Sequence, residues 1–156
     1  MKYTIIDNFL TDEENDQIIS YFETETIPVV DSWHLPNTFP LIERMISETG
    51  VKDYVGYEMH FNPGWRGYGN HFDKDEVLFN RTGELKYPLV SIVYYPIFEG
   101  IGGELILVNE GLLEIKPKRL IYFESTIEHG VNNFNGNRLS LGINPWHIIP
   151  ESYIKQ

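Results

Sequence analysis

Apolar and polar residues follow one pattern in the first third of this chain and another in the rest. Residues 2–9, KYTIIDNF, are typical of a first strand. Residues 9–23 predict a helix, with Thr11 and Glu14 at the spacing of a capping box. The apolar face of that helix is expected to consist of Ile18, Ile19 and Phe22.

A second helix is predicted after a loop that contains Pro28 and Pro36. It covers about residues 39–49, and Gly50 is expected to end it. Its apolar stripe consists of Leu41, Ile42, Met45 and Ile46.

From residue 52 onward, short apolar runs separated by Gly, Pro, Asn or Glu predict strands without helices between them. The runs are DYVGYEMHF, PLVSIVYYP, GELILV, LLEIKP, RLIYFE, HGVNNF and NRLSLGIN. Two helices followed by about eight strands indicate a mainly β, α+β chain. We expect a β-sandwich or jelly roll with the helices packed on one sheet. One domain is predicted over residues 1–156, with a helical part over about 1–50 and the jelly-roll core over about 51–148.

Composition and charge narrow the function classes. The chain has 156 residues, 14% of them aromatic, which argues against disorder. A net charge of −11 with no cluster of Lys and Arg makes a nucleic-acid partner improbable. The absence of cysteine rules out disulfides and thiolate chemistry. With no apolar run of membrane-spanning length and an acidic N-terminal segment unlike a signal peptide, the expected location is the cytoplasm.

The first candidate site residues are His71 and Asp73 in the stretch HFDKDE. If the stretch is a strand, these two side chains point the same way and can share a metal ion. The pair alone is weak evidence, because His-x-Asp also occurs by chance in loops and edge strands.

A predicted C-terminal hairpin supplies the other half of the site. Asn135-Gly136 is a strong signal for a two-residue type I′ turn. The register that follows puts His129, Arg138 and Ser140 on one face of the sheet. The opposite face is apolar and suited to packing under the helices, with Leu139, Leu141 and Ile143.

Two histidines and one carboxylate form the facial triad that binds non-haem Fe(II) and leaves positions open. Strands of opposing sheets in a jelly roll can bring the pair at 71 and 73 together with His129. A dicarboxylate such as 2-oxoglutarate needs a cation at its far end once its other carboxylate chelates iron. Arg138 offers bidentate hydrogen bonds there, and Ser140 adds a hydroxyl donor.

The motifs, in this order, resemble the prolyl 4-hydroxylase-like branch of the Fe(II)/2-oxoglutarate-dependent dioxygenases. The resemblance runs from about Tyr57 to Trp146 and includes FNPG, HFD, SIVYYP, GGEL, PKRLIYFES, EHGV and GNRLSLGINPW. It implies a double-stranded β-helix of cupin-like jelly-roll form. It also implies the ligands His71, Asp73 and His129, which form the catalytic centre, and the co-substrate-binding residues Arg138 and Ser140.

Further residues of the site follow from the resemblance less directly. Tyr95 corresponds to a tyrosine that often hydrogen-bonds the co-substrate, although a core aromatic is an equal alternative. Phe61 stands ten residues before the first ligand, where relatives often have tyrosine, so Tyr68 is the candidate for the missing hydroxyl. The mouth of the pocket is expected to be bordered by Trp65, Arg66, Tyr68, Arg81 and the loop 74–87. The other histidines, His34, His60 and His147, are expected to be structural or surface residues.

The resemblance implies a hydroxylase that uses Fe(II), O₂ and 2-oxoglutarate, with ascorbate as a candidate reductant. Its prime substrate is expected to be a small molecule or a peptide, with free or peptidyl proline as the analogy. A catalytically inactive jelly-roll binding module and a cupin-type metal isomerase or hydrolase remain alternatives. Arg138 with Ser140 distinguishes the first hypothesis, because a hydrolase needs no clamp for a distal carboxylate.

Overall fold

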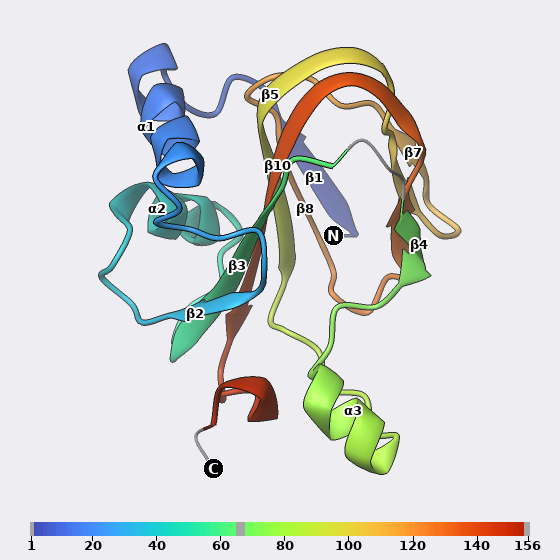
Figure 1. Cartoon of the computed structure of the whole chain (residues 1–156). Coiled ribbons are helices and arrows are strands. Elements are labelled where there is room, and N and C mark those ends of the chain that lie inside the picture. Colours follow the sequence, from blue (N-terminus) through green and yellow to red (C-terminus); the bar gives the residue numbers. More distant parts are fainter. Residues whose placement is uncertain (1, 65–67, 155–156) are drawn as a thin grey trace.

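The computed structural model describes residues 2–64 and 68–154, which form three layers (Figure 1). The helices are α1 (Asp12–Glu23), α2 (Pro40–Glu48) and α3 (Glu76–Thr82), with a 3₁₀ turn η1 (Glu151–Tyr153). The strands are β1 (Tyr3–Ile6), β2 (Ser32–His34), β3 (Gly56–Asn62), β4 (Tyr68–His71), β5 (Ser91–Gly102), β6 (Leu105–Leu107), β7 (Gly111–Leu113), β8 (Leu120–Phe123), β9 (His129–Val131) and β10 (Phe134–Trp146).

Two antiparallel sheets face each other, as the strand pattern predicted. The larger sheet has the order β1-β8-β5-β10-β3-β2, and the smaller has the order β4-β9-β6-β7. Neighbours in each sheet are mostly distant in sequence, as expected for a jelly roll. The fold-class prediction, a mainly β jelly roll with helices on one sheet, is confirmed.

The N-terminal helices cover the outer face of the larger sheet (Figure 1). The capping box of α1 forms as predicted, because Glu14 N–H donates to Thr11 Oγ1 and Thr11 N–H donates to Glu14 Oε1. Asn15 of α1 donates to the carbonyl of Pro96 and accepts from the hydroxyl of Tyr94, which ties the helix to β5. The helices and the sheet share one core that includes Ile18, Ile42, Met45, Ile46, Leu139, Leu141 and Ile143. Burial of each such side chain contributes about 1.5–3 kcal/mol.

The predicted C-terminal hairpin is wrong. Asn135 and Gly136 lie inside β10, paired with Ile101 and Gly100 of β5, and β9 pairs instead with β4 and β6. A type I′ turn needs a positive φ at both central residues, but only Gly136 has one, at 138°. The long β5–β10 ribbon arches over one end of the molecule and carries the chain from the larger sheet to the smaller one (Figure 1).

Two further predictions need correction around the first candidate pair. His71 is the last residue of β4 and Asp73 lies beyond the strand, so the two are not alternate residues of one strand. Residues 74–87, expected to be a loop, contain α3. Its local signals are ordinary, since Asp75 caps the first turn through Leu78 N–H and Gly83 ends the helix in the left-handed conformation.

None of the described helices is both long and apolar enough to cross a bilayer.

Candidate metal centre

His71 and His129 meet because they are cross-strand partners. β4 and β9 run antiparallel, and His71 lies directly opposite His129. Residues opposite each other in such a ladder project from the same face of the sheet. Their imidazole rings lie 4.5 Å apart between centroids. Residues far apart in sequence thus become a pair through strand pairing alone.

Asp73 completes the group from the segment that follows β4. Its Oδ1 lies 3.3 Å from Nε2 of His129 and 3.7 Å from Nε2 of His71. One ligand atom from each of the three residues lies within 4.8 Å of the other two. Among the residues that the structure describes, no other group of His, Asp and Glu side chains is close enough to hold a metal ion.

The hydrogen bonds of the two rings favour metal ligation through Nε2. Nδ1 of His71 lies 3.0 Å from the carbonyl of Gly69, and Nδ1 of His129 lies 2.9 Å from the carbonyl of Ile127. A carbonyl only accepts, so each Nδ1 carries the proton and each Nε2 is left as the donor atom for a metal. The residues present therefore fit a divalent metal with open positions.

Asp73 is held by two polar side chains of the larger sheet, Ser91, which was expected to face the pocket without a stated role, and Asn144, which was not predicted. Ser91 Oγ donates to its Oδ2 over 2.6 Å, and Asn144 Nδ2 donates to the same oxygen over 3.2 Å. Burial acts to raise the pKa of Asp73, but contacts with His129, His71 and Ser91 hold it well below its usual range. The carboxylate is therefore charged and fixed in direction, as a ligand must be.

A signal for these residues existed in the sequence. Ser91 and Asn144 are isolated polar residues within the apolar runs PLVSIVYYP and LGINPW, and both are buried. A buried polar side chain requires a partner. Their partner could not be named without the register, which puts Ile143 of β10 opposite Ile92 of β5 and so brings Asn144 next to Ser91.

Arg138 enters the interior from β10, not from a hairpin shared with His129. It is 4% exposed, its guanidinium lies 5.9 Å from the ring centroid of Phe134, and its Nη2 lies 3.5 Å from Ser140 Oγ. Tyr95 is also buried, so the pKa of its hydroxyl is raised, while the charge of Arg138 acts to lower it. A buried cation, a serine hydroxyl and a tyrosine thus occur together near the arch.

The remaining predicted residues have mixed outcomes. Trp65 and Arg66 lie outside the described residues, as does the side chain of Tyr68, whose backbone pairs with Val131. Phe61 packs in the core between the helices and the larger sheet and contacts Phe22 edge to face, so it does not line the pocket.

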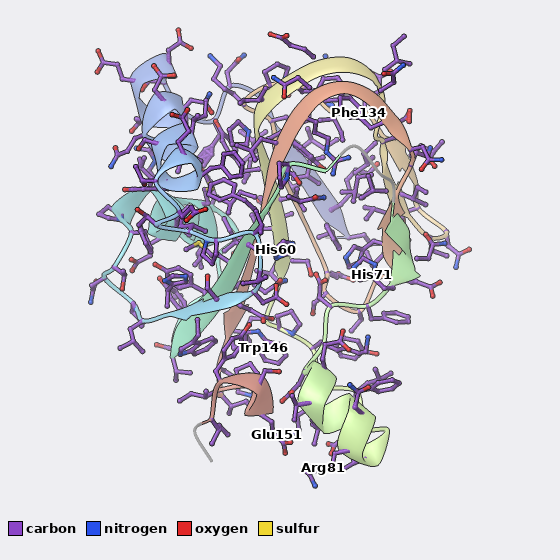
Figure 2. The ribbon with its side chains drawn as sticks, viewed as in Figure 1. His60, His71, Arg81, Phe134, Trp146 and Glu151 are labelled. Atoms are coloured by element: carbon purple, nitrogen blue, oxygen red, sulfur yellow. The ribbon has the colours of Figure 1, made fainter. Side chains whose placement is uncertain are left out.

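Arg81 lies on α3 and bonds to Glu151 of η1, as Figure 2 shows at the end of the molecule that carries α3. The pair fastens the C-terminal turn to α3. This contact gives Arg81 a structural role, which the prediction that it borders the pocket mouth did not include.

Several solved structures with this fold are prolyl hydroxylases. A viral collagen prolyl hydroxylase from Paramecium bursaria Chlorella virus-1 superimposes with a TM-score of 0.69 at 17% identity, over 96% of this chain and 91% of that one. A Pseudomonas putida prolyl-4-hydroxylase gives 0.63 at 20% identity, over 93% of this chain and 84% of that one.

The chain has the fold of the prolyl hydroxylases. A third structure, a Trichoplax adhaerens prolyl hydroxylase in complex with a peptide fragment of hypoxia inducible factor, gives a TM-score of 0.60 at 15% identity, over 99% of this chain and 88% of that one. No protein-family model and no curated protein sequence matches this chain significantly.

Proposed function

We propose that this chain is an Fe(II)- and 2-oxoglutarate-dependent dioxygenase that hydroxylates a C–H bond of its substrate. The observation that carries the proposal is the pairing of two features in one interior. One is a group of two histidines and an aspartate whose ligand atoms lie within 4.8 Å of one another; the other is the buried Arg138.

The three ligands would hold Fe(II), which supplies oxygen activation coupled to the oxidative decarboxylation of 2-oxoglutarate. The protein's contribution begins with orientation. The carbonyls of Gly69 and Ile127 keep the protons of His71 and His129 on Nδ1. Ser91 and Asn144 hold the other carboxylate oxygen of Asp73 and so keep its Oδ1 turned toward the histidines. Loss of such supporting contacts typically lowers metal affinity by about ten- to a hundredfold.

Arg138 and Ser140 would bind the distal carboxylate of 2-oxoglutarate. Arg138 is buried in a protein of net charge −11, so the overall field does not attract an anion and a local cation is required. The fork of a guanidinium matches a carboxylate with two parallel hydrogen bonds. The nearby Tyr95 is a candidate for a further donor to the same ligand.

The interior between the sheets would exclude water from the reaction. Apolar side chains of both sheets pack there in one cluster that includes Tyr95, Leu105, Leu107, Ile121 and Phe123. Phe123 contacts His129 edge to face, with 4.8 Å between ring centroids. A low-dielectric wall strengthens the charged contacts of the site and protects reactive species from side reactions.

The substrate is proposed to be a peptide or a free amino acid, with proline as the first candidate. The Trichoplax neighbour was solved with a peptide fragment, which supports an interior open to an extended chain. The acidic character of this chain argues against nucleic acid. A cytoplasmic location and a single domain over residues 1–156 are part of the proposal.

Conversion of 2-oxoglutarate to succinate tests the function directly. The Fe(II)-loaded protein should release succinate with O₂, and a panel of proline-containing peptides and free amino acids should stimulate release. The triple variant His71→Ala, Asp73→Ala, His129→Ala should lose both bound Fe(II) and succinate release. Iron bound without succinate release would indicate a binding module or a cupin-type enzyme, and wild-type iron affinity in the triple variant would refute the ligand assignment.

A further inference from the structure

The inner face of β3 carries polar side chains that face the space between the sheets. Tyr57, Met59 and Phe61 pack in the core on the helix side. Because side chains alternate along a strand, Glu58, His60 and Asn62 project to the other side. His60 therefore projects toward the space between the sheets, and 40% of its side chain remains exposed to solvent.

His60 lies over Gly142. The two residues are paired across β3 and β10. A Cβ atom at Gly142 would lie 2.8 Å from Cε1 and 3.3 Å from Nε2 of the imidazole, closer than such atoms normally approach. The absence of a side chain at 142 thus makes the space that the ring occupies. Figure 2 shows His60 on β3 and His71 on β4, on the two sides of the space between the sheets.

Gly142 lies midway between the two parts of the proposed site along β10. Two residues farther on, Asn144 donates to the ligand Asp73. Two residues earlier, Ser140 contacts Arg138. Alternate residues of a strand share a face, so a ligand that spans from the metal centre to Arg138 passes over Gly142 and alongside His60.

The ring of His60 is held by one edge and open at the other. Its Nδ1 lies 3.0 Å from Oδ1 of Asp31. Within residues 2–64 and 68–154, no hydrogen bond reaches its Nε2. Burial acts to lower the pKa of His60, but the contact with Asp31 and the charges of Asp73 and Glu58 raise it overall. The ring is thus suited to donate from Nε2 to an anion.

We propose that His60, oriented by Asp31, binds the anionic ligand that lies between the metal centre and Arg138. Under the proposed function, on which this inference rests, the ligand is 2-oxoglutarate. His60 then provides the hydrogen bond that the ring of Phe61 cannot provide. His60 is the adjacent residue of β3, and its side chain points to the opposite face of the strand, toward the space between the sheets.

The test is an anaerobic titration of the Fe(II) protein with 2-oxoglutarate, followed by the metal-to-ligand absorption band. His60→Phe keeps a ring over Gly142 but removes both nitrogens. Its dissociation constant for 2-oxoglutarate should rise about tenfold or more, as for the loss of one charge-assisted hydrogen bond. His60→Gln, which retains an N–H donor, should recover part of the loss. Iron affinity without 2-oxoglutarate should stay unchanged in both variants.

His147→Phe is the matched control, because His147 is exposed and lies outside the sandwich. The inference on His60 would be overturned, without affecting the proposed function, by either of two results. One is unchanged 2-oxoglutarate affinity in His60→Phe; the other is an equal loss of affinity in the Phe and Gln variants. A rise only in the KM for the prime substrate would also overturn it. A wild-type protein that binds iron but not 2-oxoglutarate would overturn the proposed function as well.

Discussion

At the residue scale, the site depends on how each charged side chain is compensated inside the protein. Asp73 lies beside the imidazoles of His71 and His129 and accepts hydrogen bonds from Ser91 and Asn144. Arg138 is 4% exposed and lies near the arch, where its guanidinium approaches Ser140 and the ring of Phe134. The two opposite charges occupy separate parts of the interior, which is the arrangement that a bound dicarboxylate with a metal would bridge.

The Arg138→Met variant should retain iron and lose affinity for 2-oxoglutarate. A bidentate, charge-assisted contact contributes enough that the dissociation constant should rise about tenfold to a hundredfold. Arg138→Lys should restore only part of the affinity, since an ammonium lacks the planar fork. Anaerobic titration of the Fe(II) protein measures both.

Arg44→Met serves as the control for this titration, because Arg44 is exposed and pairs with Glu14 on the helices. If Arg138→Met binds 2-oxoglutarate as the wild type does, Arg138 is not the clamp and the pocket serves another ligand.

At the element scale, the β5–β10 ribbon decides where the site residues lie. Gly100, Gly102 and Gly136 have positive φ at the arch. A Cβ atom at Gly136 would lie 2.1 Å from the carbonyl oxygen of Glu99 and 2.7 Å from the Cα of Gly100. The two backbones approach so closely at this point that neither strand tolerates a side chain there.

Asn135 and Gly136 should therefore respond differently to substitution. Gly136→Val should lower the free energy of unfolding by at least about 2 kcal/mol, through strained φ and the clash with β5. Asn135→Val should change it by less than about 1 kcal/mol, since Asn135 is exposed and extended in a strand. Urea unfolding of the metal-free variants compares the two.

A type I′ turn would require positive φ at both positions, so it would make both substitutions costly. Equal destabilisation by Asn135→Val and Gly136→Val would thus restore the hairpin interpretation and contradict the continuous strand.

At the scale of the whole molecule, Glu58 connects the larger sheet to the C-terminal turn. Its carboxylate accepts from Trp146 Nε1 over 2.9 Å and from the hydroxyl of Tyr153 over 2.7 Å. Tyr153 stacks on Trp33 of β2, with 5.4 Å between ring centroids. Burial is the main reason that the pKa of Glu58 is raised from 4.5 to about 7, although both hydrogen bonds act to lower it.

This raised pKa predicts a pH-dependent loss of stability. Between pH 4.5 and about 7 the folded protein holds a proton on Glu58 that the unfolded chain has released. The contribution of Glu58 to the free energy of unfolding is therefore fully present below pH 4.5 and is lost as the pH rises through 7. The loss amounts to at most about 3 kcal/mol. Glu58→Gln, which keeps the two hydrogen-bond acceptor contacts without ionising, should be more stable than the wild type at pH 8 and similar to it at pH 4.5.

Urea unfolding of both proteins in the presence of a chelator, at pH 4.5 and pH 8, measures the difference. Glu124→Gln, on the loop after β8, is the matched substitution elsewhere in the chain. A Glu58→Gln difference from wild type that does not change with pH would show that Glu58 titrates normally.

The sequence alone determined the features that local chemistry specifies. The capping box of α1, the apolar stripes of both helices and the short strands after residue 52 all follow from neighbours within a few residues. The sequence also predicted the residues of the site, because their chemistry depends on residue type and order. These residues are His71, Asp73, His129, Arg138 and Ser140. The structure brings the first three together, and their role as iron ligands remains a prediction.

Only the tertiary structure decided which strands pair and which side chains meet. Asn135-Gly136 satisfies the local rule for a turn, yet pairing with β5 along a strand of 13 residues outweighs it. His71 and His129 meet through β4–β9 pairing, and Ser91, Asn144 and His60 enter the site through the registers of β5, β10 and β3. Local patterns give the period of a strand but not its partner, since pairing is selected by burial and hydrogen bonding across the whole molecule.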